Sequence, residues 1–525
     1  MRQRLIMTAA VVLAVACAGR DEVGPVLRPI SLPDLSKMSG SVQTQIREAD
    51  ASLTRAIDNR QAGPAALADA YGALGRLFMA ADLDDAAEPC LLNAHALAPT
   101  DIRWPYYLGH LNRDRGELAT ARTFFERSLE LRPDDVASLV WLGDLQLALG
   151  SPNDAEPRFV KALSLQPNSL SARFGLGRTA LAKQDYRAAV THLQEVLEQD
   201  PEAASAHYPL AMAYRGLGDV KNAETHLRLR EDHKILPADP LMVELDELLE
   251  SPQAYESRGI RALDQKNFAD AAALFRKGLE IAPGTAALQH RLGTALYMMG
   301  EVASAREHFE EAVRVSPDYH LAQYSLGVLL QADSRHAEAI ERFTAALKSR
   351  PSHTAAHVRL AASLRRVGRA TEALPHYEQA VLLQPDLVEA RFGHAVTLVQ
   401  ARRYREARDR LAEGMQMFPD QSLFKHGLAR LLATAPDDRV RDGQRAMALV
   451  QHVLEQGRTL DLGATVAMAY AELGQYAQAA AIQRDLMSAA EKAGLRDLLP
   501  RLAANLALYE RREPCRTPWT ADEIP

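Results

Sequence analysis

The sequence predicts an all-α protein, a solenoid of about twelve two-helix repeats, and three recurring residue types carry that prediction. Proline, glycine and alanine each return at a step of 34 residues in the first part of the chain. A fixed step of this length is typical of a helical hairpin that is copied end to end. The positions are Pro99, Pro133, Pro167 and Pro201, then Gly75, Gly109, Gly143 and Gly177, and then Ala87, Ala121, Ala155 and Ala189.

Each recurring residue has a physical role in such a hairpin. The glycine of the first helix lets the second helix approach closely, and the alanine of the second helix takes the reciprocal contact. Proline lacks an amide hydrogen and fits poorly inside a helix, so it separates one unit from the next. Each unit buries its apolar face only against its neighbours, so a chain of 525 residues needs no single central core.

The repeated pattern resembles that of the tetratricopeptide repeat family, and the resemblance covers most of the chain. It implies a right-handed α-solenoid of helical hairpins with a concave surface that binds a partner. One unit carries the pattern as Leu74-Gly75, Phe78, Ala87, Ala94 and Pro99, and another as Leu142-Gly143, Ala155, Phe159, Ala162 and Pro167.

Composition excludes several classes of protein. The chain is 47% hydrophobic and only 6% aromatic, as closely packed helices rich in alanine and leucine require. Its net charge of −7 gives no electrostatic footprint for nucleic acid. The three cysteines, Cys17, Cys90 and Cys515, are too few for a disulfide framework, and their spacing suits no metal site.

The N-terminus, residues 1–17, has the layout of a secretory signal, with basic residues, an apolar run and then Cys17. The apolar run is too short to span a bilayer as a stable helix. The stretch from Leu13 to Cys17 resembles a bacterial lipobox, which implies a lipid on Cys17. Ala18 then implies, by resemblance to Gram-negative lipoproteins, a periplasm-facing protein of the outer membrane. The alternative is ordinary cleavage after Ala16 or Gly19, with Cys17 incidental.

The rest of the chain divides into two blocks of repeats. Residues 18–40 are expected to form a tether and residues 41–60 an N-capping helix. A first block of five repeats over residues 61–235 is followed by a spacer, residues 236–252, where the phase of the repeats breaks. A second block, residues 253–492, holds about seven repeats, the last two irregular. Residues 493–525 form a C-terminal cap and tail.

The spacer is acidic and rich in leucine. It either acts as a hinge or forms a rigid kink, and its apolar residues offer a surface for docking: Leu241, Val243, Leu245, Leu248 and Leu249. The two readings stay open at the level of the sequence.

No motif points to catalysis or to a cofactor. Gly175, Gly177 and Ala180 resemble a dinucleotide-binding motif, but Gly177 and Ala180 fall on the small-residue positions of a repeat, and no strand precedes them. His353 and His357 are four residues apart, but no third metal ligand is near in sequence. Trp104 and Trp141 are expected to pack between repeats, and Trp519 to be exposed in the tail.

The remaining candidate site is the concave face, which the resemblance assigns to the fifth, ninth and twelfth places of each first helix. Rigid aromatic rings supply contact area there, and arginine can hold carboxylates or backbone carbonyls. Whether the aromatic rings face a ligand or pack on the next helix stays open, and a solvated face is the rival reading for the arginines. The row is Tyr106, Phe174, Tyr208, Tyr324 and Phe392 with Arg76, Arg113, Arg178, Arg215, Arg365 and Arg366, and with His290 and His426 beside it.

We therefore expect a non-enzymatic scaffold, anchored by lipid, that binds a protein or peptide partner in its groove. Its role would lie in envelope assembly, secretion or a periplasmic complex. The alternative is an accessory of polysaccharide export that binds carbohydrate or the export machinery. An enzyme would need a catalytic domain, and the repeats run almost to the C-terminus, which leaves no room for one.

Overall fold

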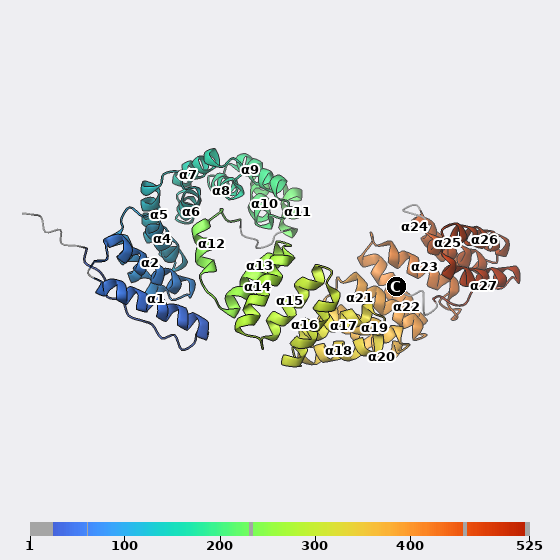
Figure 1. Cartoon of the computed structure of the whole chain (residues 1–525). Helices are drawn as coiled ribbons and strands as arrows, with labels where there is room; N and C mark the ends of the chain where they lie inside the picture. The colour runs from blue at the N-terminus through green and yellow to red at the C-terminus, as the bar shows by residue number, and fades with distance from the viewer. Residues whose placement is uncertain (1–24, 60, 230–234, 455–458, 520–525) are drawn as a thin grey trace, which may run out of the picture. The chain divides into compact units, whose positions relative to one another are not determined.

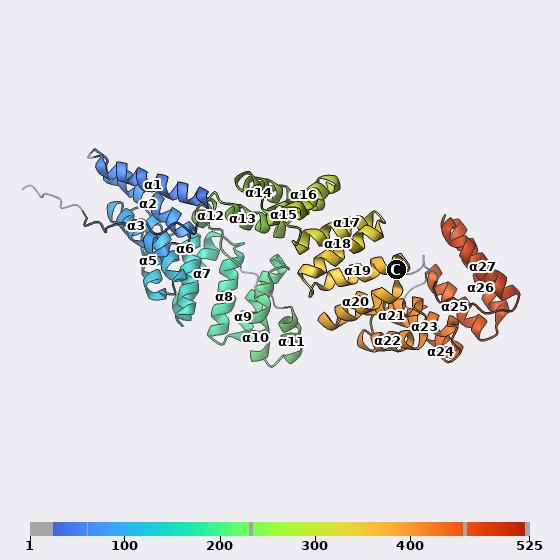
Figure 2. The same cartoon turned by 90° about the horizontal axis from the view of Figure 1, so that it is seen from below.

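The computed structural model describes residues 25–59, 61–229, 235–454 and 459–519. Within these ranges the chain forms twenty-seven α-helices and two short 3₁₀ helices, and no strand. The helices follow one another in antiparallel pairs that stack side by side (Figures 1 and 2). This arrangement confirms the prediction of a helical-repeat solenoid.

The chain divides into two compact units, Met1–Ala254 and Tyr255–Pro525. The first unit contains one leading helix, five helical pairs and one further helix after them. Its elements are α1 (Gly40–Asp58), α2 (Pro64–Ala80), α3 (Asp84–Leu97), α4 (Arg103–Asp114), α5 (Leu118–Leu131), α6 (Val136–Ala148), α7 (Pro152–Leu165), α8 (Leu170–Ala182), α9 (Tyr186–Gln199), η1 (Ala204–Ala206), α10 (His207–Gly216), α11 (Val220–Arg228) and α12 (Pro240–Glu247).

The second unit contains seven helical pairs and a closing helix. Its elements are α13 (Pro252–Asp264), α14 (Phe268–Ile281), α15 (Ala286–Met298), α16 (Val302–Val315), α17 (His320–Ala332), α18 (His336–Ser349), α19 (Thr354–Arg366), α20 (Ala370–Leu383), α21 (Val388–Gln400), α22 (Tyr404–Met417), α23 (Ser422–Thr434), α24 (Gly443–Leu454), α25 (Leu460–Glu472), α26 (Tyr476–Lys492), η2 (Arg496–Leu498) and α27 (Leu499–Glu510).

The small residues of the repeats allow the close helix contacts that the sequence predicts. A Cβ added to Gly143 of α6 would lie 2.6 Å from the ring of Phe159 in α7, and one added to Gly175 of α8 would lie 2.3 Å from the same ring. Both distances are shorter than van der Waals contact. One buried phenylalanine therefore fills the space that two glycines leave, and in the second unit Phe343 fills the space beside one glycine, Gly327.

The turn inside most repeats contains a residue in the left-handed conformation. Glycine takes this position at Gly116 and Gly150, with φ of 80° and 74°. After Gly116, the amide of Glu117 donates to the carbonyl of Asn112, which closes the end of α4. Other repeats place a residue with a side chain there, such as Gln184 with φ of 62°. An L-residue is strained in this region, whereas glycine is not.

The segment before α1 is more ordered than a tether. The backbone amide and carbonyl of Arg28 form two hydrogen bonds with the side chain of Asn93 in α3, at 2.7 and 2.9 Å. Leu35 is buried in the apolar cluster that α1, α2 and α3 share. The stretch from Arg28 to Leu35 is therefore packed on the first repeat, which corrects the expectation of a free tether there.

The C-terminal tail also packs on the repeats. Trp519 is half-buried, and the guanidinium of Arg430 in α23 lies 5.5 Å from the centre of its ring. Arg430 is itself fully buried and binds Asp461 of α25 at 2.6 Å. Cys515 is buried beside Tyr509 of α27. The prediction that Trp519 is exposed is therefore wrong, because residues 515–519 pack against the first helices of the last two repeats, α23 and α25.

No helix in the described part of the chain is both long enough and apolar enough to cross a bilayer. Cys17 and the rest of the predicted signal segment lie outside the described residues. The lipid on Cys17 stays a prediction.

Candidate functional site: the inner face of the first unit

The first helices of the repeats face the inner side of the arc in the first unit, and the second helices lie outside (Figure 1). The predicted row lies on these first helices, but its members differ widely in exposure. Tyr106 on α4 is 1% exposed, whereas Tyr208 on α10, at the same repeat position, is 53% exposed. Phe174 on α8 is half-buried, and the guanidinium of Arg178 lies 5.5 Å from its ring.

Two arginines of the predicted row in the first unit, Arg178 and Arg113, are held in place by a neighbouring repeat. Arg178 binds the carboxylate of Asp144 in α6 at 2.8 Å. Arg113 of α4 stacks over Trp141 of α6, with its guanidinium carbon 4.3 Å from the ring centre. Arg215 on α10 is exposed. The cationic groups therefore occur along the inner face from one repeat to the next.

The chain itself covers part of this face. Residues 235–250, which we call the docked segment, include α12 and lie inside the arc of α4 to α10 (Figure 1). Ile235 packs beside Leu193 and Leu210 of the fourth and fifth repeats. At the other end, Gln45 of α1 donates to the carbonyl of Leu248 and accepts from the amide of Glu250, both at 3.0 Å. The docked segment thus runs back along all five repeats to the N-terminal helix.

The main polar contact of the docked segment is the carboxylate of Asp239. One of its oxygens, Oδ2, accepts hydrogen bonds from the Tyr106 hydroxyl and from Trp141 Nε1, the latter at 2.8 Å. Its other oxygen accepts from the amide of Met242 at 3.1 Å and caps α12. The side chain of Asp239 is only 8% exposed. One buried carboxylate therefore joins α4, α6 and α12.

His110 completes the surroundings of this carboxylate. Its ring is fully buried between Tyr106, Phe125 and Trp141, and its Nε2 lies 3.6 Å from Asp239 Oδ2. Neither ring nitrogen has a hydrogen-bond partner within the described residues. Burial, helped by Arg113, lowers the pKa of His110 well below its usual value, so the ring is neutral.

Tyr106 is a hydrogen-bond donor under all ordinary conditions. Burial, with the Asp239 carboxylate beside it, raises the pKa of the Tyr106 hydroxyl far above its usual value. The proton therefore stays on the phenol oxygen and points to the carboxylate. We call Tyr106, His110 and Trp141 together the carboxylate receptor.

Further contacts fix the helical part of the docked segment. The hydroxyl of Tyr107 donates to the carbonyl of Leu241 at 3.2 Å. Arg76 of α2 lies 4.0 Å from the carboxylate of Glu244. Leu245 is 5% exposed, and Leu241 and Met242 pack against the same apolar clusters. Backbone, charge and apolar surface therefore all contribute to the docking.

Sequence reasoning missed this arrangement in part. It placed Tyr106, Arg76 and Arg113 on the inner face, and it recognised the leucines of the spacer as a docking surface. It did not bring Asp239, His110 and Trp141 together, because Asp239 is 98 positions after Trp141. An aspartate before a proline, ahead of an acidic stretch, was the available signal.

The first-helix row of the second unit is built differently. Tyr324 of α17 packs against His353, with ring centres 4.8 Å apart, and Phe392 of α21 packs edge-on against Phe424. His290 donates to or accepts from the hydroxyl of Ser325 at 3.1 Å. These aromatic side chains contact the next repeat, so in this unit the rings pack between helices, which is one of the two alternatives that the sequence left open.

The remaining members of the second row also differ from one another. Arg365 is only 5% exposed, and its burial lowers its pKa, whereas Arg366 beside it is exposed. Burial lowers the pKa of His290 to about 4. His426 of α23 lies 2.8 Å from the hydroxyl of Thr465 in α25. Only part of the predicted row is thus accessible in this unit.

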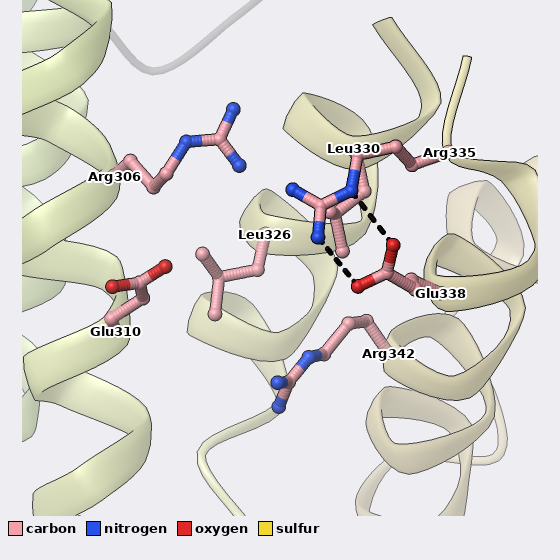
Figure 3. A pocket seen from close by; sticks show the side chains of 7 residues that line it. All are labelled: Arg306, Glu310, Leu326, Leu330, Arg335, Glu338 and Arg342. Atoms are coloured by element: carbon pink, nitrogen blue, oxygen red, sulfur yellow. Dashed lines mark hydrogen bonds and ion pairs between the residues drawn. The ribbon is translucent and has the colours of Figure 1, made fainter. Parts of the chain in front are cut away.

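A pocket in the second unit lies between α16, α17 and α18 (Figure 3). Two of its arginines are already paired: Arg335 binds Glu338 through two hydrogen bonds of 2.7 and 2.6 Å, and Arg306 binds Asp333 at 2.6 Å. Glu310 also lines the pocket, so the charges of its three arginines are balanced by those of Asp333, Glu338 and Glu310, and the pocket lacks the net positive charge that an anion site needs. It is lined by Arg306, Glu310, Leu326, Leu330, Arg335, Glu338 and Arg342.

The described residues contain no cluster of three or more histidine, cysteine, aspartate or glutamate side chains that could hold a metal ion. His353 caps α19 by accepting from the amide of Ala356, and His357 pairs with His376 at 3.1 Å. Cys90 is fully buried, and its burial raises its pKa to about 12, so its thiol is inert.

Comparison with protein families identifies the repeats. Two family models, both described as tetratricopeptide repeat, match the chain. Together they cover residues 106–232 and 290–431, which is more than half of the sequence. One matches residues 106–169, 141–186, 174–232, 290–353 and 329–388, and the other matches residues 364–431. No sequence among curated proteins matches significantly.

Several solved structures are similar to parts of this chain. A tetratricopeptide repeat protein from Parabacteroides merdae is 17% identical over 48% of this chain and 99% of its own, with a TM-score of 0.36. Yeast Tom70 is 16% identical over 78% of this chain and 96% of its own, with a TM-score of 0.31. A chain of the APC/C hetero-tetramer Cut9–Hcn1 is 11% identical over 82% of this chain and 96% of its own, with a TM-score of 0.34. These TM-scores lie below 0.5, so the similarities say nothing about what this chain binds.

Proposed function

Because this chain belongs to the tetratricopeptide repeat family, whose repeats generally bind protein partners, we propose that it is a non-enzymatic scaffold for a protein or peptide. The partner binds along the first helices of the repeats. A lipid on Cys17 holds the scaffold at the outer membrane, facing the periplasm. There it serves envelope assembly, secretion or a periplasmic enzyme complex.

One observation carries the proposal of peptide binding. The inner face of the first unit already holds a polypeptide segment, residues 235–250, through a buried carboxylate, backbone carbonyls and leucine side chains. A surface that binds one segment in this way has the donors and the apolar contacts that another polypeptide needs.

The aromatic row favours a polypeptide over a sugar. A sugar ring stacks on the open face of an aromatic side chain, and within the predicted row only Tyr208 is more than half exposed. Tyr106, Phe174, Tyr324 and Phe392 are buried or half-buried against other protein groups. An accessory of polysaccharide export that binds carbohydrate is therefore the outcome to test against, not the leading proposal.

The groove is tested by capturing partners from detergent-solubilised membranes with the full chain. The variant Tyr208→Ala/Arg215→Ala removes two exposed inner groups, whereas Tyr106→Ala would disturb a buried contact. We expect capture to fall about tenfold, as the loss of an interface hot spot does. Val160→Ser, an exposed change on the second helix α7, is the matched control. Capture that is equal for all three chains contradicts the groove, and capture of polysaccharide in place of protein supports the alternative.

The anchor is tested separately by mass analysis of the mature N-terminus. We expect a diacylated and N-acylated Cys17, and release of the chain from membranes by Cys17→Ser. An unlipidated N-terminus produced by cleavage after Ala16 or Gly19 would contradict the anchor and leave the groove unaffected.

A further inference from the structure

We propose that the inner face of the first unit is a site for one kind of segment: an acidic, leucine-rich helix that begins with an aspartate. We further propose that residues 235–250 are its resident intramolecular ligand. A partner segment of the same chemistry binds by displacing them. The inference rests on the proposed function and names the class of ligand that the first unit selects.

The first argument is the carboxylate receptor. The Tyr106 hydroxyl and Trp141 Nε1 both point to one oxygen of Asp239, and the buried ring of His110 lies beside that oxygen. All three side chains belong to the repeats, and the carboxylate does not. A buried donor without a partner is costly, by about 1–3 kcal/mol in proteins. A partner that covers these donors again must therefore supply an acceptor for them, and a carboxylate can accept from both, as Asp239 does.

The second argument concerns the position of that carboxylate. Asp239 caps α12, so its backbone enters a helix directly after the receptor. Leu241 and Met242 follow two and three positions later and pack on α2, α4 and α6, and Leu245 follows six positions later. The apolar side chains thus share one face of a short helix whose start the receptor fixes. A partner must present the same order of groups.

The third argument is charge. Residues 238–250 contain five acidic residues and no basic one, while the inner face that receives them contains Arg76 and Arg215, together with Arg113 and Arg178, which are paired with Asp114 and Asp144. Arg76 is the inner-face arginine beside an acid of the docked segment, at 4.0 Å from Glu244. Opposite charges favour acidic ligands and suppress basic ones. The acids are Asp239, Glu244, Asp246, Glu247 and Glu250.

The fourth argument is that the hydrogen bonds of Gln45 and Tyr107 go to the backbone of the docked segment, so they do not depend on its sequence. Gln45 binds a carbonyl and an amide, and Tyr107 binds a carbonyl. Any polypeptide can supply these groups. The site therefore combines one selective carboxylate contact with backbone contacts that any partner satisfies, which is the usual division in peptide recognition.

The docked segment lowers the affinity for such a partner without blocking it. A ligand joined to its site by a short stretch of chain acts at an effective concentration on the order of millimolar. An external segment of equal intrinsic affinity must compete with it, and its apparent affinity falls in proportion to the fraction of sites that are free. Weak ligands therefore do not displace the docked segment, whereas ligands of high affinity or high local concentration do.

The test uses a fluorescein-labelled peptide of residues 236–250 and the full chain. The variant Asp239→Ala/Leu241→Ser/Leu245→Ser weakens the docked segment but leaves the receptor intact. We expect the peptide to bind this variant at least tenfold more tightly than the wild-type chain, because the tethered competitor is removed. A peptide with Asp239→Asn should bind the variant about tenfold more weakly, because a charged acceptor is lost.

Adding Tyr106→Phe/Trp141→Phe to the variant should remove the preference for the aspartate peptide. Equal binding of the peptide to the wild-type chain and the variant would overturn the proposal, and so would no binding to a variant that keeps its helical circular dichroism. If the variant unfolds, hydrogen exchange of the wild-type chain decides. Excess peptide should deprotect α12, and unchanged protection overturns the proposal.

These outcomes are separate from those of the capture experiment. Capture of partners that is unchanged in Tyr208→Ala/Arg215→Ala counts against the proposed function, whether or not the labelled peptide binds. A failure of the peptide to bind counts against this inference alone, since the inner face of the second unit and the exposed groups of the first are not part of it.

Discussion

The two units are built from the same repeat but differ in what lies on their first helices. In the first unit the inner side chains of α4 and α6 bind a segment outside the repeats, through Asp239. In the second unit the corresponding side chains bind the next repeat, as Tyr324 does with His353 and His290 with Ser325. The repeat therefore determines where a side chain lies, and the segments between and after the repeats determine whether it is available.

The pair Tyr106 and Tyr208 makes the same point within one unit. Both are tyrosines at the fifth place of a first helix, three repeats apart, and their exposed fractions are 1% and 53%. Tyr106 lies under the docked segment and donates to Asp239. Equal positions in a repeat thus become a buried structural contact in one place and an accessible surface in another.

The largest expected effect tests what the two units share. Phe159→Ala and Phe343→Ala remove the second-helix ring that packs on a first-helix glycine, one in each unit. We expect each to lower the free energy of unfolding by about 3–5 kcal/mol, because each leaves a cavity in a fully buried site. Urea titration followed by circular dichroism measures both. Losses that differ by more than about 2 kcal/mol would contradict equivalent packing in the two units.

Both units bury a neutral histidine, His110 in the first and His290 in the second, and His290 predicts a pH dependence over a defined range. Burial lowers the pKa of His290 from 6.5 to about 4, so the folded chain keeps this ring neutral where the unfolded chain binds a proton. Its contribution to stability is therefore complete above pH 6.5 and is lost as the pH falls towards 4, by at most about 3 kcal/mol.

The comparison chain for this prediction is His290→Gln, which cannot titrate. Its free energy of unfolding should fall less steeply than that of the wild-type chain between pH 6.5 and 4. Parallel curves for the two chains over this range would show that His290 does not titrate in this way.

The hydrogen bond between Tyr106 and Asp239, which among the described residues has no counterpart at Tyr324 of the second unit, is tested by a double-mutant cycle. Asp239→Asn and Tyr106→Phe should each destabilise the first unit by about 1–2 kcal/mol, because each weakens a buried hydrogen bond to a charged group. Their effects should be coupled by at least about 0.5 kcal/mol. Urea titration followed by circular dichroism measures the change. Tyr208→Phe, at the same place of another repeat, should have almost no effect, and a loss equal to that of Tyr106→Phe would refute the distinction.

The smallest expected effect concerns the turns, which the two units share. Gln184 and Ser334 take the left-handed conformation with φ of 62° and 61°. Replacing either with glycine should raise the free energy of unfolding by about 0.5–1 kcal/mol, because the strain of the side chain exceeds the entropy that glycine loses. Gly150→Ala should lower it by a similar amount. A stabilising Gly150→Ala would contradict the assignment of these turns.

The sequence could predict the helices and their pairing because those depend on contacts between near neighbours. Glycine, alanine and proline at a step of 34 report the approach of one helix to the next, and the structure contains these contacts at Gly143 and Phe159. The same local pattern placed the candidate row on the first helices. It also explains why the number of pairs, twelve among the described residues, could be estimated before the structure.

The sequence could not predict which segments outside the repeats pack on these helices. Position within a repeat gives the direction of a side chain, but Asp239 and the tail at Trp519 reach their contacts from far along the chain. The apolar residues of the spacer predicted that it docks, but they did not indicate the surface on which it docks. The lipid on Cys17 and the partner contacts of the row remain predictions, because neither is a property of packing.

The most direct test of the central claim is hydrogen exchange of the full chain, with and without the carboxylate receptor. In the wild-type chain we expect the amides of α12 to be protected to nearly the same degree as those of α4 and α6. In Tyr106→Phe/Trp141→Phe we expect α12 to lose most of this protection while α13 to α26 keep theirs. Fast exchange of α12 in the wild-type chain, at the rate of an isolated peptide, would contradict the account, because residues 235–250 would then not occupy the inner face of the first unit.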